Sequence, residues 1–169
     1  VYIYLKEFSN KNFIYKQELI DALDLPIVGE LIYSANNEKG LVVKPGIRNI
    51  INEQFRELRT NITFLKKGAQ SQSILITSST SGEGKSFVSV NLATSLANAG
   101  RRVVLLEFDL RKPKVHQYLG IEKGNGLSNF LVGNIDLPEM LKSVESTENL
   151  TLITAGHLSL IHISQGIVR

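Results

Sequence analysis

The residues with the clearest chemical potential lie in the run Ile-Leu-Ile-Thr-Ser-Ser-Thr-Ser-Gly-Glu-Gly-Lys-Ser at positions 74–86. A short apolar segment leads into a loop with two glycines, and the loop ends in Gly84, Lys85 and Ser86. In loops of this kind the backbone N–H groups surround an anion, and the following helix adds its positive N-terminal end. The lysine reaches the β- and γ-phosphates of a nucleotide, and the serine hydroxyl ligates Mg²⁺. The pattern therefore predicts a nucleotide phosphate site.

One position departs from the pattern G-x-x-x-x-G-K-[ST], because Ser79 stands where the first glycine is expected. Gly82 and Gly84 remain, and glycine allows a positive φ wherever the tight turn requires one. A plain turn between strand and helix is the alternative interpretation, but such a turn does not require a lysine and a serine at the helix start. We assign nucleotide contacts to the loop and the first helical turn, namely Ser81, Gly82, Glu83, Gly84, Lys85, Ser86 and Phe87.

A second group of chemically active residues follows at the end of the segment Val103–Phe108, which is predicted to be a strand. Alternation along this strand places Glu107 and Asp109 on one side of the extended chain. Ligands of open parallel sheets bind at the carboxyl ends of the strands, so both acids are expected beside the phosphate loop. There they are candidates for Mg²⁺ ligands or for a base that accepts a hydroxyl proton. Simple pairing with Arg111 and Lys112 is the alternative.

The elements around these residues predict an α/β fold with a parallel sheet. We expect a strand at residues 73–78, a helix at 85–99 that Gly100 ends, and the next strand at 103–108. This strand–helix–strand order implies a parallel sheet with a right-handed crossover. The weaker segments are predicted to be short helical turns at 115–119, 127–132 and 138–144 and a third core strand at 150–154.

Ahead of the loop, apolar spacing indicates one further helix. Its apolar residues fall within an arc of roughly 80° at about 100° per residue, which predicts an amphipathic helix over residues 47–65. The stripe consists of Ile47, Ile51, Phe55, Leu58, Ile62 and Leu65. Glu53, Arg56 and Arg59 lie on the opposite side, where a solvated charged face is the plain interpretation. The leading region before residue 46 is expected to hold a helix at 16–23, a strand at 27–33 and a polar turn at 34–40.

Composition narrows the class of protein. The chain has 169 residues, of which 43% are hydrophobic and 21% charged, as in an ordinary globular domain. A net charge of +3 mildly favours an anionic partner but is too small to indicate nucleic acid, and we expect no nucleic-acid partner. The absence of cysteine excludes disulfides, thiolate metal sites and a cysteine nucleophile. No apolar run approaches the ~18 residues that a membrane span requires.

The run ITSSTSGEGKS, followed by VNLATSLANAGRRVVLLEFDLRKP, resembles the cytoplasmic kinase domain of the bacterial tyrosine kinases. These are the autokinases of capsular and exopolysaccharide chain-length regulators. Their Walker A′ motif has the form apolar-Asp-x-Asp-x-Arg, and here residues 107–111 read EFDLR, with glutamate for the first aspartate. The resemblance implies a P-loop NTPase-type parallel sheet with flanking helices, and ATP and Mg²⁺ as cofactors. It implies Lys85, Asp109 and Glu107 as catalytic residues, and Ser86, Asp109 and Glu107 as metal ligands.

The same resemblance implies self-association. The family uses a Glu-x-x-Arg-x-x-Arg motif to form a ring, and Glu53, Arg56 and Arg59 have that spacing. In such a ring the tyrosine-bearing tail of one subunit reaches the active site of its neighbour. The resemblance also implies the polysaccharide export machinery as a partner. It places the protein at the cytoplasmic face of the bacterial inner membrane, held there by segments outside this chain.

Two features depart from the family and lead us to expect a C-terminally truncated chain. No Walker B motif, an apolar run ending in aspartate, occurs near residues 151–156, and no tyrosine-rich tail follows. After LITAG the chain continues HLSLIHIS, which we interpret as a non-native tail. The expected domains are thus a juxtamembrane region at 1–45, the first part of the kinase domain at 46–156 and the tail at 157–169.

The three histidines show no metal-binding or catalytic pattern, and two alternative functions remain open. His116, His157 and His162 are expected to be surface residues and not ligands. One alternative function is a nucleotide-binding, ring-forming fragment without catalysis. The other is a partitioning-type ATPase, which the sequence disfavours because Thr80 occupies the position of that group's signature lysine.

Overall fold

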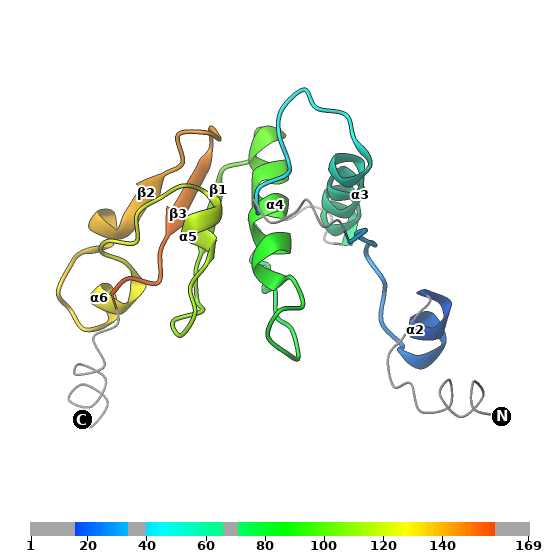
Figure 1. Ribbon diagram of the computed structural model, residues 1–169, viewed down its shortest axis with the longest axis horizontal. Helices are drawn as coiled ribbons and strands as arrows, with labels where there is room; N and C mark the ends of the chain where they lie inside the picture. The colour runs from blue at the N-terminus through cyan, green and yellow to red at the C-terminus, as the bar shows by residue number, and fades with distance from the viewer. Residues whose placement is uncertain (1–15, 34–39, 66–70, 158–169) are drawn as a thin grey trace.

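The computed structural model describes residues 16–33, 40–65 and 71–157. Figure 1 shows helix α4 between the sheet and helix α3, with α2 at the far end from the sheet. The elements in chain order are α2 (Lys16–Ala22), α3 (Ile50–Leu65), α4 (Lys85–Asn98), β1 (Val103–Leu106), α5 (Val115–Tyr118), α6 (Leu127–Leu131), the 3₁₀ helix η2 (Leu137–Met140), β2 (Leu141–Ser143) and β3 (Leu150–Ile153). Among the described residues, no helix combines the length and the apolar character needed to cross a bilayer.

The sheet has the order β1-β3-β2 and is mixed. β1 and β3 pair in parallel, with Val103 opposite Leu150, and this confirms the predicted third strand. β2 pairs antiparallel with β3, so the helical turn predicted at 138–144 is wrong beyond Met140. The strand forms there because the chain reverses between Val144 and Leu150, where the Val144 N–H donates to the Leu150 carbonyl at 3.2 Å.

Two predicted strands are absent from the described part of the chain. Residues 27–33 and 71–78 are extended but belong to no ladder. A cavity of about 2040 Å³ separates the segment 71–77 from β1, and Leu75 is 86% exposed. An extended segment becomes a strand only when a neighbour satisfies its backbone N–H and C=O groups. The strand predicted at 73–78 is therefore wrong, although the helix that follows it forms.

Helix α3 begins at Ile50, three residues later than predicted, because Asn49 caps it. The Asn49 side-chain oxygen accepts the Asn52 N–H at 2.9 Å, as an N-cap residue does. The centre of the apolar stripe packs against α4, with Phe55 fully buried and edge-on to Phe87 at a ring-centroid distance of 5.8 Å. The ends of the stripe, Ile47 and Leu65, lie beyond this contact and are exposed.

Helix α4 is buried on two sides, which explains its largely apolar sequence. One side packs against α3 and the other against β1 and β3, where Val90, Ala93 and Leu152 belong to one core cluster. The helix ends as predicted at Gly100, whose φ is +81°. The Gly100 N–H donates to the Ala97 carbonyl, and the Arg101 N–H donates to the Leu96 carbonyl. These two hydrogen bonds form a Schellman motif.

The leading region contributes two structured pieces. α2 confirms the helix predicted at 16–23, and residues 41–43 pack against α3 and α4. The polar turn predicted at 34–40 lies outside the described residues except for Gly40, and so does the tail apart from His157. The domain boundaries at 45–46 and 156–157 stay predictions.

Candidate nucleotide-binding site

The predicted phosphate loop leads directly into α4. Gly84 is the N-cap residue with φ +94°, and Gly82 has φ +95°, so both glycines adopt the positive φ that the sequence predicts. Side chains other than glycine rarely adopt this conformation. A Cβ atom built at either glycine would meet nothing within 4 Å, so the space above the turn is open. The loop backbone is thus accessible to a ligand at the positive end of α4.

Glu83 braces the loop from within. Its carboxylate accepts the Thr80 N–H at 3.2 Å, the Thr80 hydroxyl at 2.8 Å and the Ser79 hydroxyl at 2.9 Å. These hydrogen bonds, led by the Thr80 backbone N–H, hold the pKa of Glu83 below its ordinary value. Ser79, which replaces the expected glycine, is therefore used to close the turn. Glu83 is exposed, and its side chain contacts the loop itself.

Lys85 and Asp109 meet between the loop and the end of β1. The Lys85 ammonium lies 3.5 Å from Asp109 Oδ2, and the two side chains are 33% and 32% exposed. The other carboxylate oxygen of Asp109 accepts the Lys112 N–H at 3.0 Å. That N–H, and then the charge of Lys85, lower the pKa of Asp109 against the opposing effect of burial. The expectation that the strand end delivers an acid to the loop is confirmed for Asp109.

Glu107 has a different environment, and the expectation that both acids lie on one side is wrong. Its side chain is buried, with 2% of the residue exposed, and its carboxylate accepts the N–H groups of Val115 at 2.7 Å and Ala155 at 3.2 Å. His116 Nδ1 lies 3.2 Å from both carboxylate oxygens. Strand β1 ends at Leu106, so strict alternation does not extend to Asp109.

The contact of His116 with Glu107 is one that sequence reasoning missed. His116 is only 7% exposed, so the expectation of a surface position is wrong for it. His157 is exposed as expected, and His162 lies outside the described residues. Nothing in the spacing of His116 from Glu107 indicated their contact, because α5 is too short to show a periodic pattern.

The donors near the loop fit a hard cation shared with a nucleotide. Ser86 and Asp109 both line the cavity between segment 71–77 and β1 and supply a hydroxyl and a carboxylate. Magnesium usually binds through one or two protein oxygens, with phosphate oxygens and water completing its octahedron. In the part of the chain that the structure describes, no three His, Asp or Glu side chains form a metal-binding group by themselves. A nucleotide-bound Mg²⁺ therefore suits this donor set.

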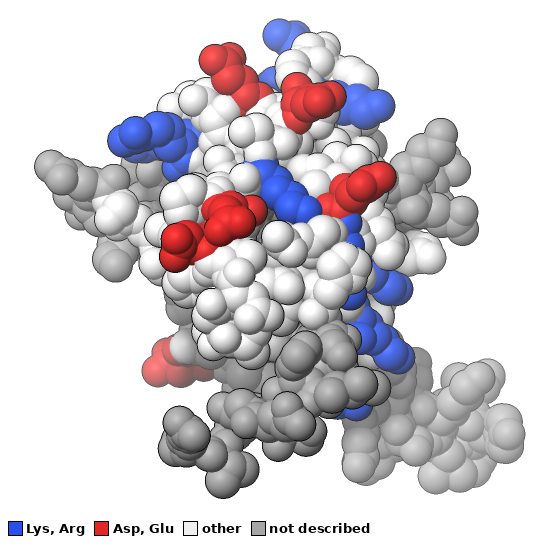
Figure 2. All heavy atoms as spheres, turned by 90° about the vertical axis from the view of Figure 1, so that its left-hand side faces the viewer, with Lys and Arg blue, Asp and Glu red and all other residues white. Residues whose placement is uncertain are grey.

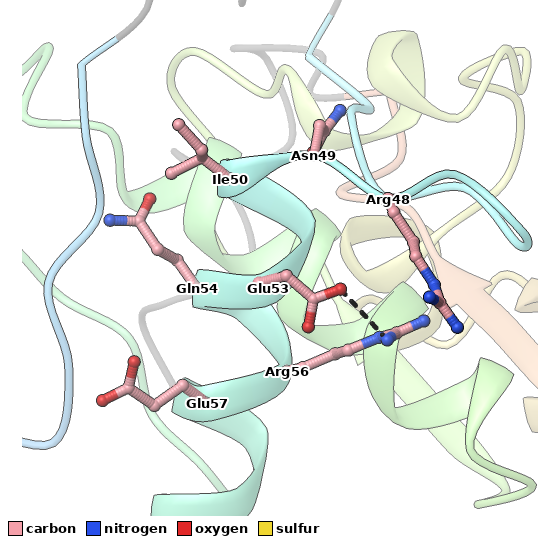
Figure 3. Close-up of a pocket in the computed structure, with 7 residues that line it drawn as sticks. All are labelled: Arg48, Asn49, Ile50, Glu53, Gln54, Arg56 and Glu57. Carbon is pink, nitrogen blue, oxygen red and sulfur yellow. Dashed lines mark hydrogen bonds and ion pairs between the residues drawn. The ribbon is translucent and has the colours of Figure 1, made fainter.

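The three residues of the Glu-x-x-Arg-x-x-Arg pattern do not act as a unit in the single chain. Glu53 and Arg56 form an exposed ion pair at 3.1 Å beside a surface pocket of about 700 Å³ (Figure 3). Arg59 turns instead toward α4 and donates to the Ser95 carbonyl at 2.9 Å. The pocket is lined by Arg48, Asn49, Ile50, Glu53, Gln54, Arg56 and Glu57.

A second surface has mixed charge. Figure 2 views the side of the molecule that carries β2 and α6, and across its upper half acidic and basic side chains are interspersed. Separated charges of both signs are what a solvated surface shows.

Comparisons with known proteins agree with this geometry. The chain is 36% identical over 109 residues to the putative tyrosine-protein kinase CapB of Staphylococcus aureus, a match covering 64% of this chain and 47% of CapB. It is 33% identical over 119 residues to the tyrosine-protein kinase YwqD of Bacillus subtilis, covering 70% of this chain and 50% of YwqD. The chain thus spans about half the length of these two relatives.

Structural similarity leads to the same group. The crystal structure of the chimerical protein CapA2B2 matches with a TM-score of 0.75 and 32% identity, covering 86% of this chain and 62% of that one. These matches confirm the resemblance to the bacterial tyrosine kinases. The family described as the CobQ/CobB/MinD/ParA nucleotide binding domain matches residues 74–158, which include the loop, α4 and the whole sheet. The chain therefore belongs to the CobQ/CobB/MinD/ParA nucleotide-binding domain family.

Proposed function

We propose that this chain is the ATP-binding part of a protein tyrosine autokinase that transfers the γ-phosphoryl group of ATP to tyrosine. The observation that carries the proposal is the contact between Lys85 and Asp109, which joins the phosphate loop to the acidic end of β1 at 3.5 Å. The similarity to proteins named tyrosine-protein kinases supports phosphoryl transfer to tyrosine. We extend the proposal to a role in regulating capsular or exopolysaccharide synthesis and export.

The residues have separate roles in this proposal. N–H groups of residues 81–87 donate to phosphate oxygens, and Lys85 stabilises the negative charge that grows on the transferred group. Ser86 and Asp109 hold Mg²⁺, which neutralises phosphate charge when bound. Asp109 also orients the tyrosine hydroxyl and acts as the base that accepts its proton. Glu107 has no assigned role as a metal ligand, because each of its carboxylate oxygens accepts a backbone N–H.

The assembly of the protein forms the second part of the proposal. We assign Glu53 and Arg56 to a contact between subunits of a ring, since both are exposed on the outer face of α3. Arg59 holds α3 against α4 through its hydrogen bond to the Ser95 carbonyl. The ring presents a neighbour's tyrosine tail to the active site at the cytoplasmic face of the inner membrane, next to the export machinery.

Nucleotide binding is tested by thermal unfolding with and without ATP and Mg²⁺. A ligand that binds only the folded state raises the melting temperature, by mass action. We expect protection in the wild type and in the control Lys44→Ala, which changes an exposed lysine outside the cavity between segment 71–77 and β1. Lys85→Ala should lose most of the protection. Equal protection of Lys85→Ala and Lys44→Ala would remove the basis for the assigned site.

Phosphoryl transfer is tested separately with a polymer of glutamate and tyrosine as acceptor, detected with an antibody against phosphotyrosine. We expect the wild type to phosphorylate the polymer and Asp109→Asn to show no transfer while keeping its fold. Nucleotide protection without any transfer in the wild type would favour the alternative of a nucleotide-binding fragment without catalysis.

Ring formation is tested by light scattering on Arg56→Ala and Arg59→Ala. Because the partner of Arg56 among the described residues is the exposed Glu53, its loss should weaken association and change the free energy of unfolding by less than about 0.5 kcal/mol. Arg59→Ala removes a bond between α3 and α4 and should destabilise the chain by about 1 kcal/mol. An unchanged size distribution for Arg56→Ala would contradict the proposed contact.

A further inference from the structure

The buried pair Glu107 and His116 connects three separate parts of the fold. Glu107 follows β1 directly, His116 belongs to α5, and the Ala155 N–H that donates to Glu107 follows β3. Both side chains are buried, and the Glu107 side chain is entirely so. A carboxylate buried in this way is stable only if its oxygens accept hydrogen bonds or pair with a positive group.

The hydrogen bonds around Glu107 are complete without a metal. Oε1 accepts the Val115 N–H, Oε2 accepts the Ala155 N–H, and His116 Nδ1 is 3.2 Å from each. Each carboxylate oxygen already accepts a backbone N–H, and a proton on His116 Nδ1 lets the ring donate to the same two oxygens. The Glu107 side chain therefore acts as a connector between backbone segments.

The bond from Val115 to Glu107 closes a loop of residues 107–115 across its base. Asp109 lies within this loop, accepts the Lys112 N–H and reaches Lys85 on the opposite side of the site. Among the described residues ahead of the α5 cap Lys114, the backbone–backbone bonds of this loop run from the Glu107 N–H to the Ile153 carbonyl, at its first residue, and from the Leu110 N–H to the Phe108 carbonyl. The position of Asp109 thus depends on what holds the base of the loop.

We propose that Glu107 and His116 form a buried clamp that fixes the base of loop 107–115 and thereby positions Asp109 against Lys85. Glu107 and His116 are positioning residues and touch neither nucleotide nor metal. The functional consequence rests on the proposed role of Lys85 and Asp109, whereas the clamp itself is a property of the unliganded chain.

Amide hydrogen exchange of the unliganded chain tests the clamp directly. In Glu107→Gln one carboxylate oxygen becomes an NH₂ group that cannot accept, so exchange at Val115 or Ala155 should accelerate about tenfold or more. The Lys112 amide, which Glu107 does not touch, should accelerate as well because its acceptor is Asp109. The matched control Glu145→Gln changes an exposed glutamate and should leave all three rates unchanged.

Two changes at His116 separate positioning from general loss of stability. His116→Asn keeps an N–H donor near the place of Nδ1, whereas His116→Ala removes it. We expect Lys112 exchange to stay near the wild-type rate in His116→Asn and to accelerate in His116→Ala. The Val88 amide, bonded to Gly84 at the start of α4, serves as the internal reference. If Glu107→Gln accelerates exchange at Val88 as much as at Lys112, the substitution has destabilised the whole chain. The comparison of His116→Asn with His116→Ala then tests the clamp.

The outcomes that overturn the clamp are specific. Unchanged Lys112 exchange in both Glu107→Gln and His116→Ala overturns it, and so does acceleration in His116→Asn equal to that in His116→Ala. In the phosphotransfer assay, the clamp predicts that His116→Ala lowers kcat about tenfold with little change in the KM for ATP. A raised Mg²⁺ requirement in Glu107→Gln but not in His116→Ala would instead make Glu107 a ligand. Absence of transfer in the wild type refutes the proposed function and leaves the exchange result standing.

Discussion

Asn91 offers the sharpest test of how the leading segment is attached to the nucleotide-binding core. The side chain is completely buried in α4. Its oxygen accepts the N–H groups of Val42 at 2.8 Å and Val43 at 3.0 Å, and its NH₂ group donates to the carbonyls of Gly40 at 2.7 Å and Phe87 at 2.9 Å. All four hydrogen-bonding positions of the amide are therefore used.

The substitution Asn91→Ala removes all four bonds. At about 1 kcal/mol each, their loss lowers the free energy of unfolding by about 4 kcal/mol. The higher helix propensity of alanine returns about 0.5 kcal/mol. Water reaches the partly exposed Val42 backbone more easily than that of buried Val43, which reduces the loss further. We expect a net destabilisation of about 3 kcal/mol.

Urea unfolding followed by far-UV circular dichroism measures this difference. Asn98→Ala is the matched control, because it makes the same change in the same helix at an exposed position. The control should change stability by no more than about 0.5 kcal/mol, the helix-propensity effect alone. If Asn91→Ala falls within that margin of Asn98→Ala, the hydrogen bonds do not attach the segment and the reasoning is refuted.

Two further predictions concern backbone geometry and charge. Gly40→Ala should destabilise more than Gly46→Ala by about 1–3 kcal/mol in the same assay, because both residues have positive φ but only a Cβ at Gly40 falls inside the Tyr118 ring; equal losses would contradict this packing. For Glu83, carboxyl NMR should give a midpoint below the ordinary 4.5, and Thr80→Val should raise it by removing one donor. Because the folded-state pKa is lowered, the stabilisation exists above pH 4.5 and is lost as the pH falls through the folded-state value. A midpoint unmoved by Thr80→Val would show that the hydroxyl does not contribute.

The helices could be predicted because their signals are local. The apolar stripe and Asn49 define α3, while the loop glycines and Gly100 define the two ends of α4. Each of these signals acts within about one helical turn, through hydrogen bonds between near neighbours. The prediction for α3 erred by three residues because apolar spacing alone does not identify the cap.

The strands could not be predicted equally well, because a strand exists only with its partner. The apolar segment 73–78 has strand-like composition but no ladder, whereas residues 141–143 formed β2 through pairing with β3. In both cases the presence or absence of a pairing partner outweighed local preference.

The site divides in the same way. The sequence by itself determined the turn that leads into α4, since Gly82 and Gly84 adopt the positive φ that glycine allows. Only the tertiary structure decided which acid meets Lys85. Glu107 and Asp109 are two residues apart, yet the N–H groups of Val115 and Ala155 draw Glu107 into the core and leave Asp109 at the loop. Those donors come from other elements, and a buried carboxylate goes where hydrogen bonds replace its lost water.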